Sequence, residues 1–196
     1  MTVNTIELNR ARQSLEDYDE IWLFGYGSLI YKVDFPYLEK SPAYIQGWAR
    51  RFWQGSHDHR GTPEKPGRVA TLIKQSNARC DGMAYRVTEG VFEHLDHREK
   101  NGYLRHEVSI MLVKENGQII KKRGLIYIAD EDNEAYLGET SEQQIACQIA
   151  ASCGPSGENS EYLIALDQAL TDLGADDQHV KNISAYLTQL LADKPS

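Results

Sequence analysis

A chain of 196 residues with 41% hydrophobic residues can bury one sizeable core, and its length favours a single domain over residues 1–196. Its formal net charge of −8 argues against nucleic acid or an anionic membrane as the main partner. No segment approaches the roughly 20 apolar residues of a membrane-spanning helix, and the polar N-terminal stretch lacks the pattern of a signal peptide.

The first predicted elements are a helix and a series of strands. Residues 1–18 are mostly polar but carry three apolar residues at helical spacing, Leu8, Ala11 and Leu15. This spacing predicts a short helix packed on the body of the protein. A buried strand is expected at residues 21–24, where an apolar run ends at Gly25. Further strands are expected in three later stretches, at about residues 43–54, 67–74 and 80–87.

A helix and a hairpin are predicted in the middle of the chain. Thr88 is expected to cap a helix that runs to about Lys100 and closes at Asn101-Gly102. A hairpin follows, and Asn116-Gly117 favours a type I′ turn between its two strands, residues 105–113 and 119–128.

The last third of the chain has a helical pattern. Ser141-Glu142-Gln143-Gln144 has the spacing of a capping box, and three helices are expected, near residues 141–152, 158–173 and 176–192. Strands therefore dominate the first two thirds of the chain and helices the last third. That segregation favours an α+β fold, in which a closed or nearly closed, mainly antiparallel sheet carries helices on its outside.

The first candidate for chemistry is a glycine-containing loop, Phe24-Gly25-Tyr26-Gly27-Ser28-Leu29, at the end of the buried strand. Glycines allow backbone conformations and close approaches that a Cβ would prevent. Successive N–H groups in such a loop can bind a carboxylate or a developing oxyanion. It is not a dinucleotide-binding fingerprint, because the third glycine would fall at Ile30. An ordinary tight turn is the alternative interpretation.

The second candidate is a carboxylate on the predicted helix that follows Thr88. At about 100° per residue from Val91, Glu99 falls near 80°, within the apolar arc, and Asp96 near 140°, at its edge. A carboxylate on a buried helix face is costly to desolvate and tends to have a raised pKa, which suits a general base. A structural ion pair with a buried arginine is the alternative.

Histidines and cysteines form a third, weaker group. The pairs His57-x-His59 and His94-x-x-His97 could suggest a metal site, but no acidic residue or cysteine completes a ligand pattern, and the helical pair faces solvent in the projection. No metal is therefore expected. The three cysteines, Cys80, Cys147 and Cys153, are an odd number without C-x-x-C spacing, which suggests a reducing compartment and a cytoplasmic location.

In combination, these residues resemble the ChaC-type glutathione-specific γ-glutamylcyclotransferases. The resemblance runs from about Glu20 to Leu173 and rests on six motifs: Phe24-Gly25-Tyr26-Gly27-Ser28-Leu29-Ile30, Pro66-Gly67-Arg68-Val69, Leu95-Asp96-x-Arg98-Glu99-x-x-Gly102-Tyr103, Tyr127-Ile128-Ala129, Asn133-x-x-Tyr136-x-Gly138, and Gly154-Pro155-Ser156-Gly157-x-Asn159-x-x-Tyr162-Leu163. Two features depart from the family pattern. Tyr31 stands where a tryptophan is expected, and residues 1–18 extend the N-terminus.

The resemblance implies a small β-barrel fold, an enzyme without a cofactor, and glutathione as a small-molecule substrate. It implies that Glu99 is the catalytic base. It also implies that the strand-end loop binds the substrate, through Leu23, Phe24, Gly25, Tyr26, Gly27 and Ser28. Arg98 and Tyr103 are possible supporting residues beside Glu99.

The expected reaction is an intramolecular cyclisation. The α-amine of the γ-glutamyl group attacks its own γ-amide carbon, which releases 5-oxoproline and cysteinylglycine, with Glu99 moving the proton. Three alternatives stay open: the same chemistry on γ-glutamyl amino acids or γ-glutamylamines, a non-catalytic module that binds γ-glutamyl metabolites, and a metal-binding protein. Arg60 and Arg68 are candidate contacts for the glycine carboxylate of glutathione, with solvated loop charges as the alternative.

Overall fold

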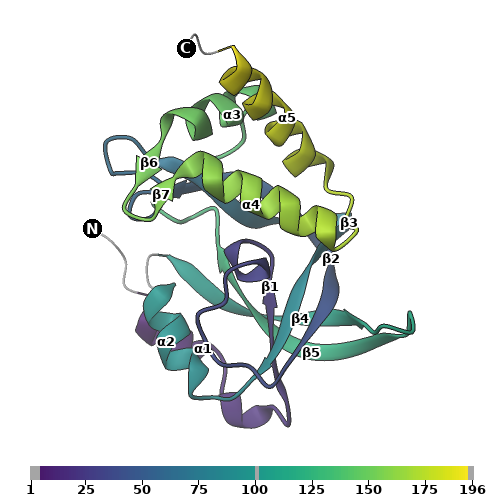
Figure 1. The fold of residues 1–196 in the computed structure, drawn as a ribbon. Coiled ribbons are helices and arrows are strands. Elements are labelled where there is room, and N and C mark those ends of the chain that lie inside the picture. Colours follow the sequence, from purple (N-terminus) through teal and green to yellow (C-terminus); the bar gives the residue numbers. More distant parts are fainter. Residues whose placement is uncertain (1–4, 100–101, 194–196) are drawn as a thin grey trace. The chain divides into compact units, whose positions relative to one another are not determined.

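The computed structural model describes residues 5–99 and 102–193 (Figure 1). The chain divides into two compact units: a barrel unit of residues 1–49 and 72–134, and a helical unit of residues 50–71 and 135–196. The expected single domain over residues 1–196 stays a prediction. The strands are β1 (Ile21–Gly25), β2 (Glu39–Ser56), β3 (Gly67–Val87), β4 (Tyr103–Val113), β5 (Ile119–Ala129), β6 (Cys153–Gly154) and β7 (Gly157–Glu158). The helices are α1 (Ile6–Arg12), α2 (Val91–Arg98), α3 (Glu142–Ala151), α4 (Asn159–Asp172) and α5 (Gln178–Ala192), with 3-10 turns at Leu15–Asp17 and Ser28–Ile30.

The five long strands close into a barrel in the order β1-β3-β2-β4-β5. β1 runs antiparallel to β3, β2 antiparallel to β4, and β4 antiparallel to β5. The closing pair is parallel, with Leu23 of β1 opposite Leu125 of β5. The predicted α+β fold with a closed, mainly antiparallel sheet is therefore confirmed.

One strand prediction is wrong in its division. The two strands expected at residues 67–74 and 80–87 are a single strand of 21 residues, β3. Residues 74–77 are polar and exposed, which gave the sequence the look of a turn. Side chains along a strand point alternately to the two faces of the sheet, so both faces are exposed over these four residues while the backbone keeps its strand conformation.

The turn of the β4–β5 hairpin also differs from its prediction. Gly117 has φ +79°, but no described residue other than glycine has a positive φ, so Asn116 does not adopt the left-handed conformation that a type I′ turn requires. Instead, the Gly117 N–H donates to the Lys114 carbonyl at 2.8 Å, and the Lys114 N–H donates to the Gln118 carbonyl at 2.9 Å. This pattern fits the three-residue hairpin in which a turn is followed by a left-handed glycine.

A compact hydrophobic core holds α2 on the barrel. Val91, Phe92 and Leu95 of α2 are buried against barrel residues that include Leu23, Tyr85 and Leu125. The predicted cap at Thr88 is wrong: the N-cap is Gly90, and the Thr88 carbonyl accepts from the Val91 N–H at 3.2 Å. The predicted end of this helix at Lys100 and Asn101 lies outside the described residues, and the helix proper ends at Arg98.

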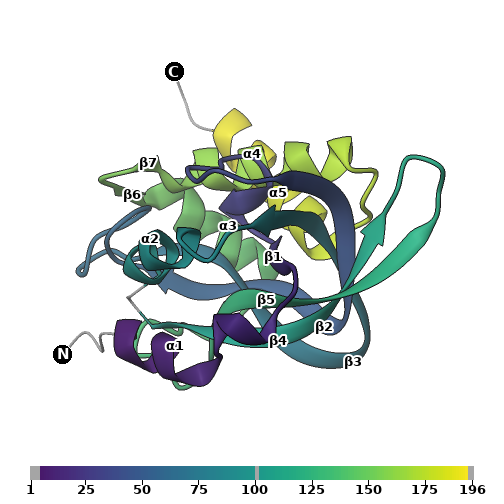
Figure 2. The same ribbon diagram turned by 90° about the horizontal axis from the view of Figure 1, so that it is seen from below.

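The N-terminal helix α1 lies beside β4 (Figure 2) but contacts it through a face that the sequence did not indicate. Leu8, one of the three apolar residues that predicted the helix, is 51% exposed, and Ala11 is exposed too. The buried residues are polar: Asn9 is 0% exposed and Thr5, just before the helix, is 3% exposed. α1 is therefore attached by hydrogen bonds rather than by an apolar stripe.

The helical unit packs α3, α4 and α5 against one another (Figure 1). All three predicted helices are confirmed, each within two residues of its expected ends. The predicted cap at Ser141 is also confirmed, since its hydroxyl accepts from the Gln144 N–H at 3.2 Å. Within the described part of the chain, no helix combines the length and the apolar character needed to cross a membrane.

A buried histidine joins α5 to β2 in the helical unit. The Phe52 N–H donates to His179 Nε2 at 3.0 Å, so Nδ1 carries the proton and faces Glu142 Oε1 at 3.1 Å. Burial first, and then the positive charge of Arg51, lower the pKa of His179, and they outweigh the opposing effects of Glu142 and Asp177. Protonation of Nε2 would also remove the acceptor for the Phe52 N–H.

This arrangement predicts a loss of stability in mild acid. Because the pKa of His179 is lower in the folded state than its usual value of about 6.5, the unfolded state binds more protons below that pH, and the free energy of unfolding should fall as the pH drops further. His179→Gln should make the free energy of unfolding nearly constant between about pH 7 and pH 5.5. Urea denaturation at several pH values measures this. His97→Gln, at an exposed position on α2, is the control and should keep the wild-type slope.

Candidate active site

The glycine-containing loop leaves the barrel at the end of β1. Leu23 and Phe24 are 0% and 1% exposed, so their side chains belong to the core and only their backbone could face a ligand. A Cβ on Gly25 would lie 2.6 Å from Leu29 Cβ, so this glycine permits the chain to fold back on itself. Gly27 has φ −125°, so its position does not depend on the left-handed freedom of glycine.

The loop continues into a short 3-10 turn at Ser28–Ile30. The Ile30 N–H donates to the Gly27 carbonyl at 3.0 Å, which closes the turn. The N–H groups of Ser28 and Leu29, at the start of the turn, have no acceptor within it. They are the donors that an anion at this loop could use.

Two tyrosines fix the loop to the barrel. The Tyr26 hydroxyl donates to the Tyr127 carbonyl at 2.9 Å, and the Tyr85 hydroxyl donates to the Leu29 carbonyl at 2.5 Å. Burial, and to a smaller degree Tyr37, raise the pKa of Tyr85 far above its usual value, so its phenol stays a donor at physiological pH. The loop backbone is thereby held before any ligand arrives.

Glu99 stands one residue beyond α2, as its C-cap. Its N–H donates to the Leu95 carbonyl at 2.8 Å, and its own carbonyl accepts from the Tyr103 N–H at 3.2 Å. The helical projection assumed that the helix continues through Glu99, and in the structure it does not. The Glu99 side chain is 17% exposed, so the carboxylate is partly shielded but accessible.

Arg98 links this carboxylate to the glycine-containing loop. Its Nε lies 3.5 Å from Glu99 Oε1, its Nη2 donates to Ser28 Oγ at 3.1 Å, and its Nη1 donates to Asp34 Oδ1 at 2.7 Å. The Arg98 guanidinium therefore contacts three parts of the chain: Glu99 at the end of α2, Ser28 in the loop, and Asp34 in the segment that follows the loop. Its positive charge also favours the ionised form of Asp34.

Asp34 is a member of this group that the sequence did not indicate. Burial of the Asp34 carboxyl acts to raise its pKa, but Arg98 and His94 together outweigh that effect, so the pKa is lowered. Asp34 is thus an anion that holds the Arg98 guanidinium in place. Its distance of 64 residues along the chain from Arg98 is the reason that spacing could not reveal it.

Asp96 of α2 is more deeply buried than Glu99: it is only 2% exposed. The Tyr127 hydroxyl donates to Asp96 Oδ1 at 2.6 Å, and Arg105 Nη1 lies 3.8 Å from the same oxygen. Burial, the hydrogen bond to Asp96 and the charges of Asp96 and Glu99 raise the pKa of Tyr127 far above its usual value. The alternative considered for Glu99, an ion pair with a buried arginine, describes Asp96 instead.

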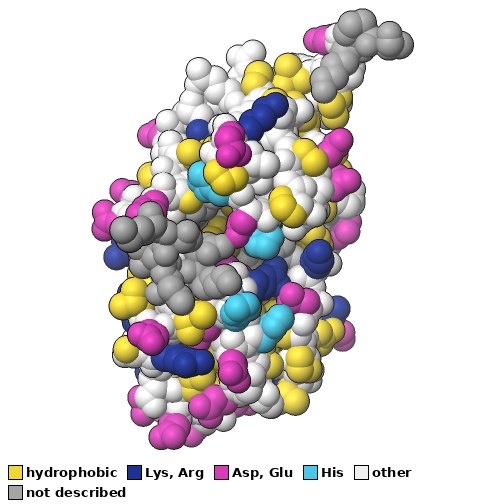
Figure 3. Space-filling view, turned by 90° about the vertical axis from the view of Figure 1, so that its left-hand side faces the viewer, with side chains coloured by type: hydrophobic (Ala, Val, Ile, Leu, Met, Phe, Trp, Pro, Cys, Tyr) yellow, Lys and Arg dark blue, Asp and Glu magenta, His cyan; other side chains and the backbone are white. Residues whose placement is uncertain are grey.

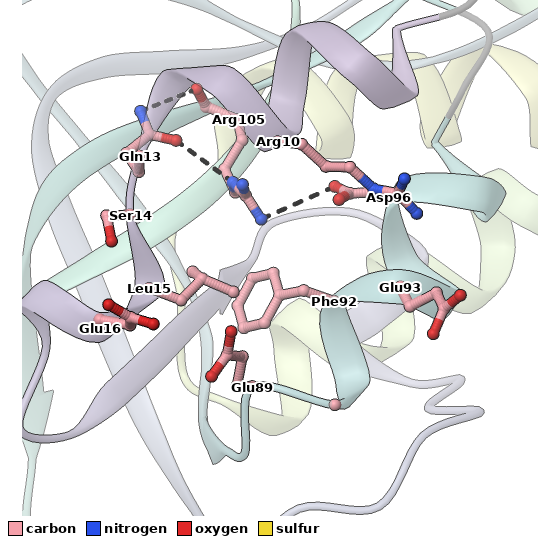
Figure 4. A pocket seen from close by; sticks show the side chains of 11 residues that line it. Arg10, Gln13, Ser14, Leu15, Glu16, Glu89, Phe92, Glu93, Asp96 and Arg105 are labelled. Atoms are coloured by element: carbon pink, nitrogen blue, oxygen red, sulfur yellow. Dashed lines mark hydrogen bonds and ion pairs between the residues drawn. The ribbon is translucent and has the colours of Figure 1, made fainter.

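A pocket of about 660 Å³ lies between the N-terminal segment and α2, and Asp96 and Arg105 form part of its wall (Figure 4). Arg105 stands between Gln13 and Asp96 in this view, and the ring of Phe92 lies below, 5.3 Å from the guanidinium carbon. The pocket is lined by Arg10, Gln13, Ser14, Leu15, Glu16, Glu89, Gly90, Phe92, Glu93, Asp96 and Arg105. Its acidic residues outnumber its basic ones, and Glu99 is not among them.

The histidine pairs behave as surface residues. His94 and His97 are exposed, as the projection predicted, and histidines are visible at the surface in Figure 3 among charged side chains of both signs. His94 pairs with Asp34 at 3.4 Å, and His59 lies 3.2 Å from Ser156 Oγ. Among residues 5–99 and 102–193, no group of three or more histidines, cysteines or acidic residues is arranged to hold a metal ion.

The two arginines proposed for the substrate carboxylate have protein partners in the helical unit. Arg68 is 6% exposed, and its guanidinium donates to Gln148 Oε1 at 2.6 Å and to the carbonyls of Phe52 and Gly138. Burial lowers the pKa of Arg68. Arg60 pairs with Glu161 at 3.1 Å. Arg68 is therefore a buried structural cation rather than the solvated loop charge that the sequence also allowed.

Comparisons with known proteins agree with the resemblance seen in the motifs. A family model described as "ChaC-like protein" matches residues 21–190. Gamma-glutamylcyclotransferase 2-3 of Arabidopsis thaliana is 40% identical over 182 residues, which cover 88% of this chain and 91% of that protein. Glutathione-specific gamma-glutamylcyclotransferase 1 of Danio rerio is 41% identical over 175 residues, with 85% and 88% covered. The crystal structure of the yeast gamma-glutamyl cyclotransferase specific to glutathione matches with a TM-score of 0.80 at 34% identity, covering 88% of this chain and 97% of that chain.

The burial of Asp96 yields a prediction about stability. Asp96→Asn should leave the buried Arg105 without a counter-ion, and breaking such a pair typically costs about 3–5 kcal/mol of unfolding free energy. Chemical denaturation measures the loss. Asp176→Asn, which removes an exposed ion pair with Lys181, is the control and should be close to the wild type. A near-normal stability for Asp96→Asn would show that this pair does not hold α2.

Proposed function

Because the chain belongs to the ChaC-like family, we propose that it is a glutathione-specific γ-glutamylcyclotransferase with Glu99 as its general base. The named relatives support the activity and the substrate. The observation that carries the site assignment is the Arg98 guanidinium, which lies 3.5 Å from the Glu99 carboxylate and donates to Ser28 of the loop. This guanidinium connects the partly exposed Glu99 carboxylate with the loop that carries the Ser28 and Leu29 N–H groups, which supports the assignment.

In the proposed reaction the substrate supplies its own nucleophile. The α-amine nitrogen of the γ-glutamyl group attacks the γ-amide carbon and forms the C–N bond of a five-membered lactam. The electron pair of the amide C=O moves onto oxygen and returns as the C–N bond to cysteine breaks. The products are 5-oxoproline and cysteinylglycine, and neither an oxidant nor a further reactant is needed.

Glu99 has two tasks in this scheme. Its carboxylate takes a proton from the substrate ammonium, which frees the lone pair for attack, and gives that proton to the departing nitrogen of cysteinylglycine. The ring nitrogen loses a second proton when it becomes the lactam N–H, and the same carboxylate passes it to the released amine, which leaves as an ammonium. A positioned acid–base group typically contributes about 10²–10⁴-fold to the rate. The ion pair with Arg98 suits the first task, since a carboxylate must be ionised to accept a proton.

The loop from Leu23 to Ser28 would hold the glutamyl head. Its N–H groups, fixed by the tyrosine hydrogen bonds at Tyr26 and Tyr85, can bind a carboxylate or a developing oxyanion without reorganising. An extended γ-glutamyl chain rarely folds back on itself in water. Holding it curled could therefore supply a large share of the rate, up to about 7–11 kcal/mol in favourable systems.

Two related assignments belong to the same proposal. We place the protein in the cytoplasm because its three cysteines are odd in number and lack a paired spacing. The rival substrates are γ-glutamyl amino acids and γ-glutamylamines, which contain the same reacting atoms. In a module that only binds γ-glutamyl metabolites, the Glu99 carboxylate would pair with the α-ammonium without accepting its proton, and a product assay separates this alternative from the enzyme.

The first test is product formation and its dependence on Glu99. Incubation with glutathione should yield 5-oxoproline and cysteinylglycine in equal amounts. Glu99→Gln keeps the shape of the side chain but cannot accept a proton, so turnover should fall at least about 10²-fold while the fold and glutathione binding persist. Glu93→Gln, on an exposed position of α2, is the matched control and should keep normal turnover. Near-normal turnover in a folded Glu99→Gln protein would show that Glu99 is not the general base.

The second test concerns specificity. The reacting atoms are the same in glutathione, γ-glutamylcysteine and γ-glutamylalanine, so discrimination must come from binding the cysteinylglycine part and using that energy to orient the glutamyl head. We expect kcat/KM to be highest for glutathione by at least about tenfold. Equal values for the three substrates would favour the broader γ-glutamylcyclotransferase assignment and leave the chemistry of Glu99 intact.

A further inference from the structure

The N-terminal segment that precedes the family match contacts the chain at Glu99 and in the strand that follows it. The family model begins at residue 21, and α1 ends at Arg12. Thr5 Oγ1 donates to the Glu99 carbonyl at 3.3 Å, and Asn9 Nδ2 donates to the Tyr103 carbonyl at 3.0 Å. The Tyr103 N–H in turn donates to the Glu99 carbonyl. Three described hydrogen bonds thus meet at the backbone of the proposed base and of the strand that follows it.

Asn9 takes the place of a neighbouring strand at this end of β4. The register of β2 against β4 includes Met111 and Leu112, near the far end of the strand. At the near end, the Asn9 side chain donates to the Tyr103 carbonyl and accepts from the Arg105 N–H at 2.8 Å. A primary amide that bonds one residue's carbonyl and the second following N–H reproduces the bonding of a strand partner.

The same segment also holds the cation that pairs with α2. The guanidinium of Arg105 donates to the Asn9 carbonyl. Its Nε donates to Gln13 Oε1 at 3.2 Å (Figure 4). Arg12 Nε donates to the Arg105 carbonyl at 2.8 Å. Since Arg105 faces Asp96 on α2, the N-terminal segment is connected to Glu99 through α2 as well as through β4.

We infer that residues Thr5–Gln13 are a brace that positions Glu99 for proton transfer, with Asn9 as the central positioning residue. The inference rests on the proposed function of Glu99. The brace acts on the backbone around the base and touches no reacting atom. A shift of the carboxylate by a fraction of an ångström changes the rate of proton transfer more than it changes substrate binding, so the brace should influence kcat more than KM.

Asn9→Leu is the decisive variant, because leucine has a similar size and can make none of these side-chain hydrogen bonds. We expect kcat to fall about tenfold with KM within about twofold of the wild type, measured well below the melting temperature. Thr5→Val should lower kcat by a smaller factor, and Thr5→Ser, which keeps the hydroxyl donor, should restore it. Glu7→Ala, on the exposed side of α1, is the control on the same helix.

A merely structural role for α1 predicts a different result. Ile183→Val in the buried core of the helical unit removes one methylene group and should lower the melting temperature, so it serves as a matched destabilised control. If Asn9→Leu lowers the melting temperature but leaves kcat as unchanged as Ile183→Val does, the inference is wrong. Equal kcat values for Thr5→Val and Thr5→Ser would also contradict it.

Hydrogen exchange separates a failure of the brace from a failure of the proposed function. The amide hydrogens of Tyr103 and Arg105 should exchange faster in Asn9→Leu than in the wild type, whereas those of α5 should not change. Wild-type and Glu99→Gln turnover are measured in the same series. If the wild type forms no 5-oxoproline, the proposed function fails, and unchanged exchange at Tyr103 and Arg105 would separately reject the brace.

Discussion

The barrel unit depends on one buried charge. A carboxylate that leaves water loses several kcal/mol of hydration, so it must be paired and hydrogen bonded where it ends up. Asp96 meets this requirement only where α2 presents it to the Tyr127 hydroxyl and the Arg105 guanidinium, which come from β5 and β4. That pairing, together with the apolar contacts of Val91, Phe92 and Leu95, fixes the rotation and depth of α2 on the barrel. The placement of α2 in turn sets the positions of Arg98, its last residue, and of Glu99, its C-cap.

Two carboxylates three residues apart are thereby suited to different tasks. Asp96 is 2% exposed, and its carboxylate accepts from the Tyr127 hydroxyl and faces the Arg105 guanidinium. Glu99 lies one residue past the helix, where the chain turns toward β4, and its carboxylate remains partly exposed beside Arg98. A base must both accept and release a proton during each turnover, so access matters to it as much as burial. Asp96 and Glu99 therefore differ because α2 ends between them: Asp96 lies within the helix and is buried, whereas Glu99 lies just past its end and is partly exposed.

The sequence predicted most of the fold because the barrel and the three C-terminal helices follow their hydrophobic patterns. The sequence-based predictions were wrong, or incomplete, where polar residues determine the local structure. The polar residues 74–77 predict a break between two strands, although the backbone of β3 continues through them. The helical projection placed Glu99 in the apolar arc because it extended α2 beyond Arg98. Asp34 could not be found from spacing, since it meets Arg98 only through the folding of the chain.

The N-terminal helix shows the same limit most clearly. Its apolar residues indicated the side that should be buried, yet the buried side carries Asn9 and the exposed side carries Leu8. The reason lies in the hydrogen bonding of β4, whose near end would otherwise present unpaired backbone groups. A buried backbone group left unpaired costs about 1–3 kcal/mol, and the N-terminal segment bonds two such groups at Arg105, its N–H and its carbonyl. Together they outweigh the roughly 1.5–3 kcal/mol that burial of one leucine would contribute.

The hydrogen bonds that attach α1 to β4 also connect α1 with α2, because both helices contact Arg105. Arg105 bonds to the Asn9 carbonyl and faces the Asp96 carboxylate, so one guanidinium serves both α1 and α2. Buried polar groups that share a partner respond to one another, because the loss of one bond leaves the others in a poorly solvated site. A change in α1 must therefore be felt at α2 even though their apolar surfaces contribute little to the contact. The N-terminal segment is consequently part of the framework that sets the geometry at Glu99.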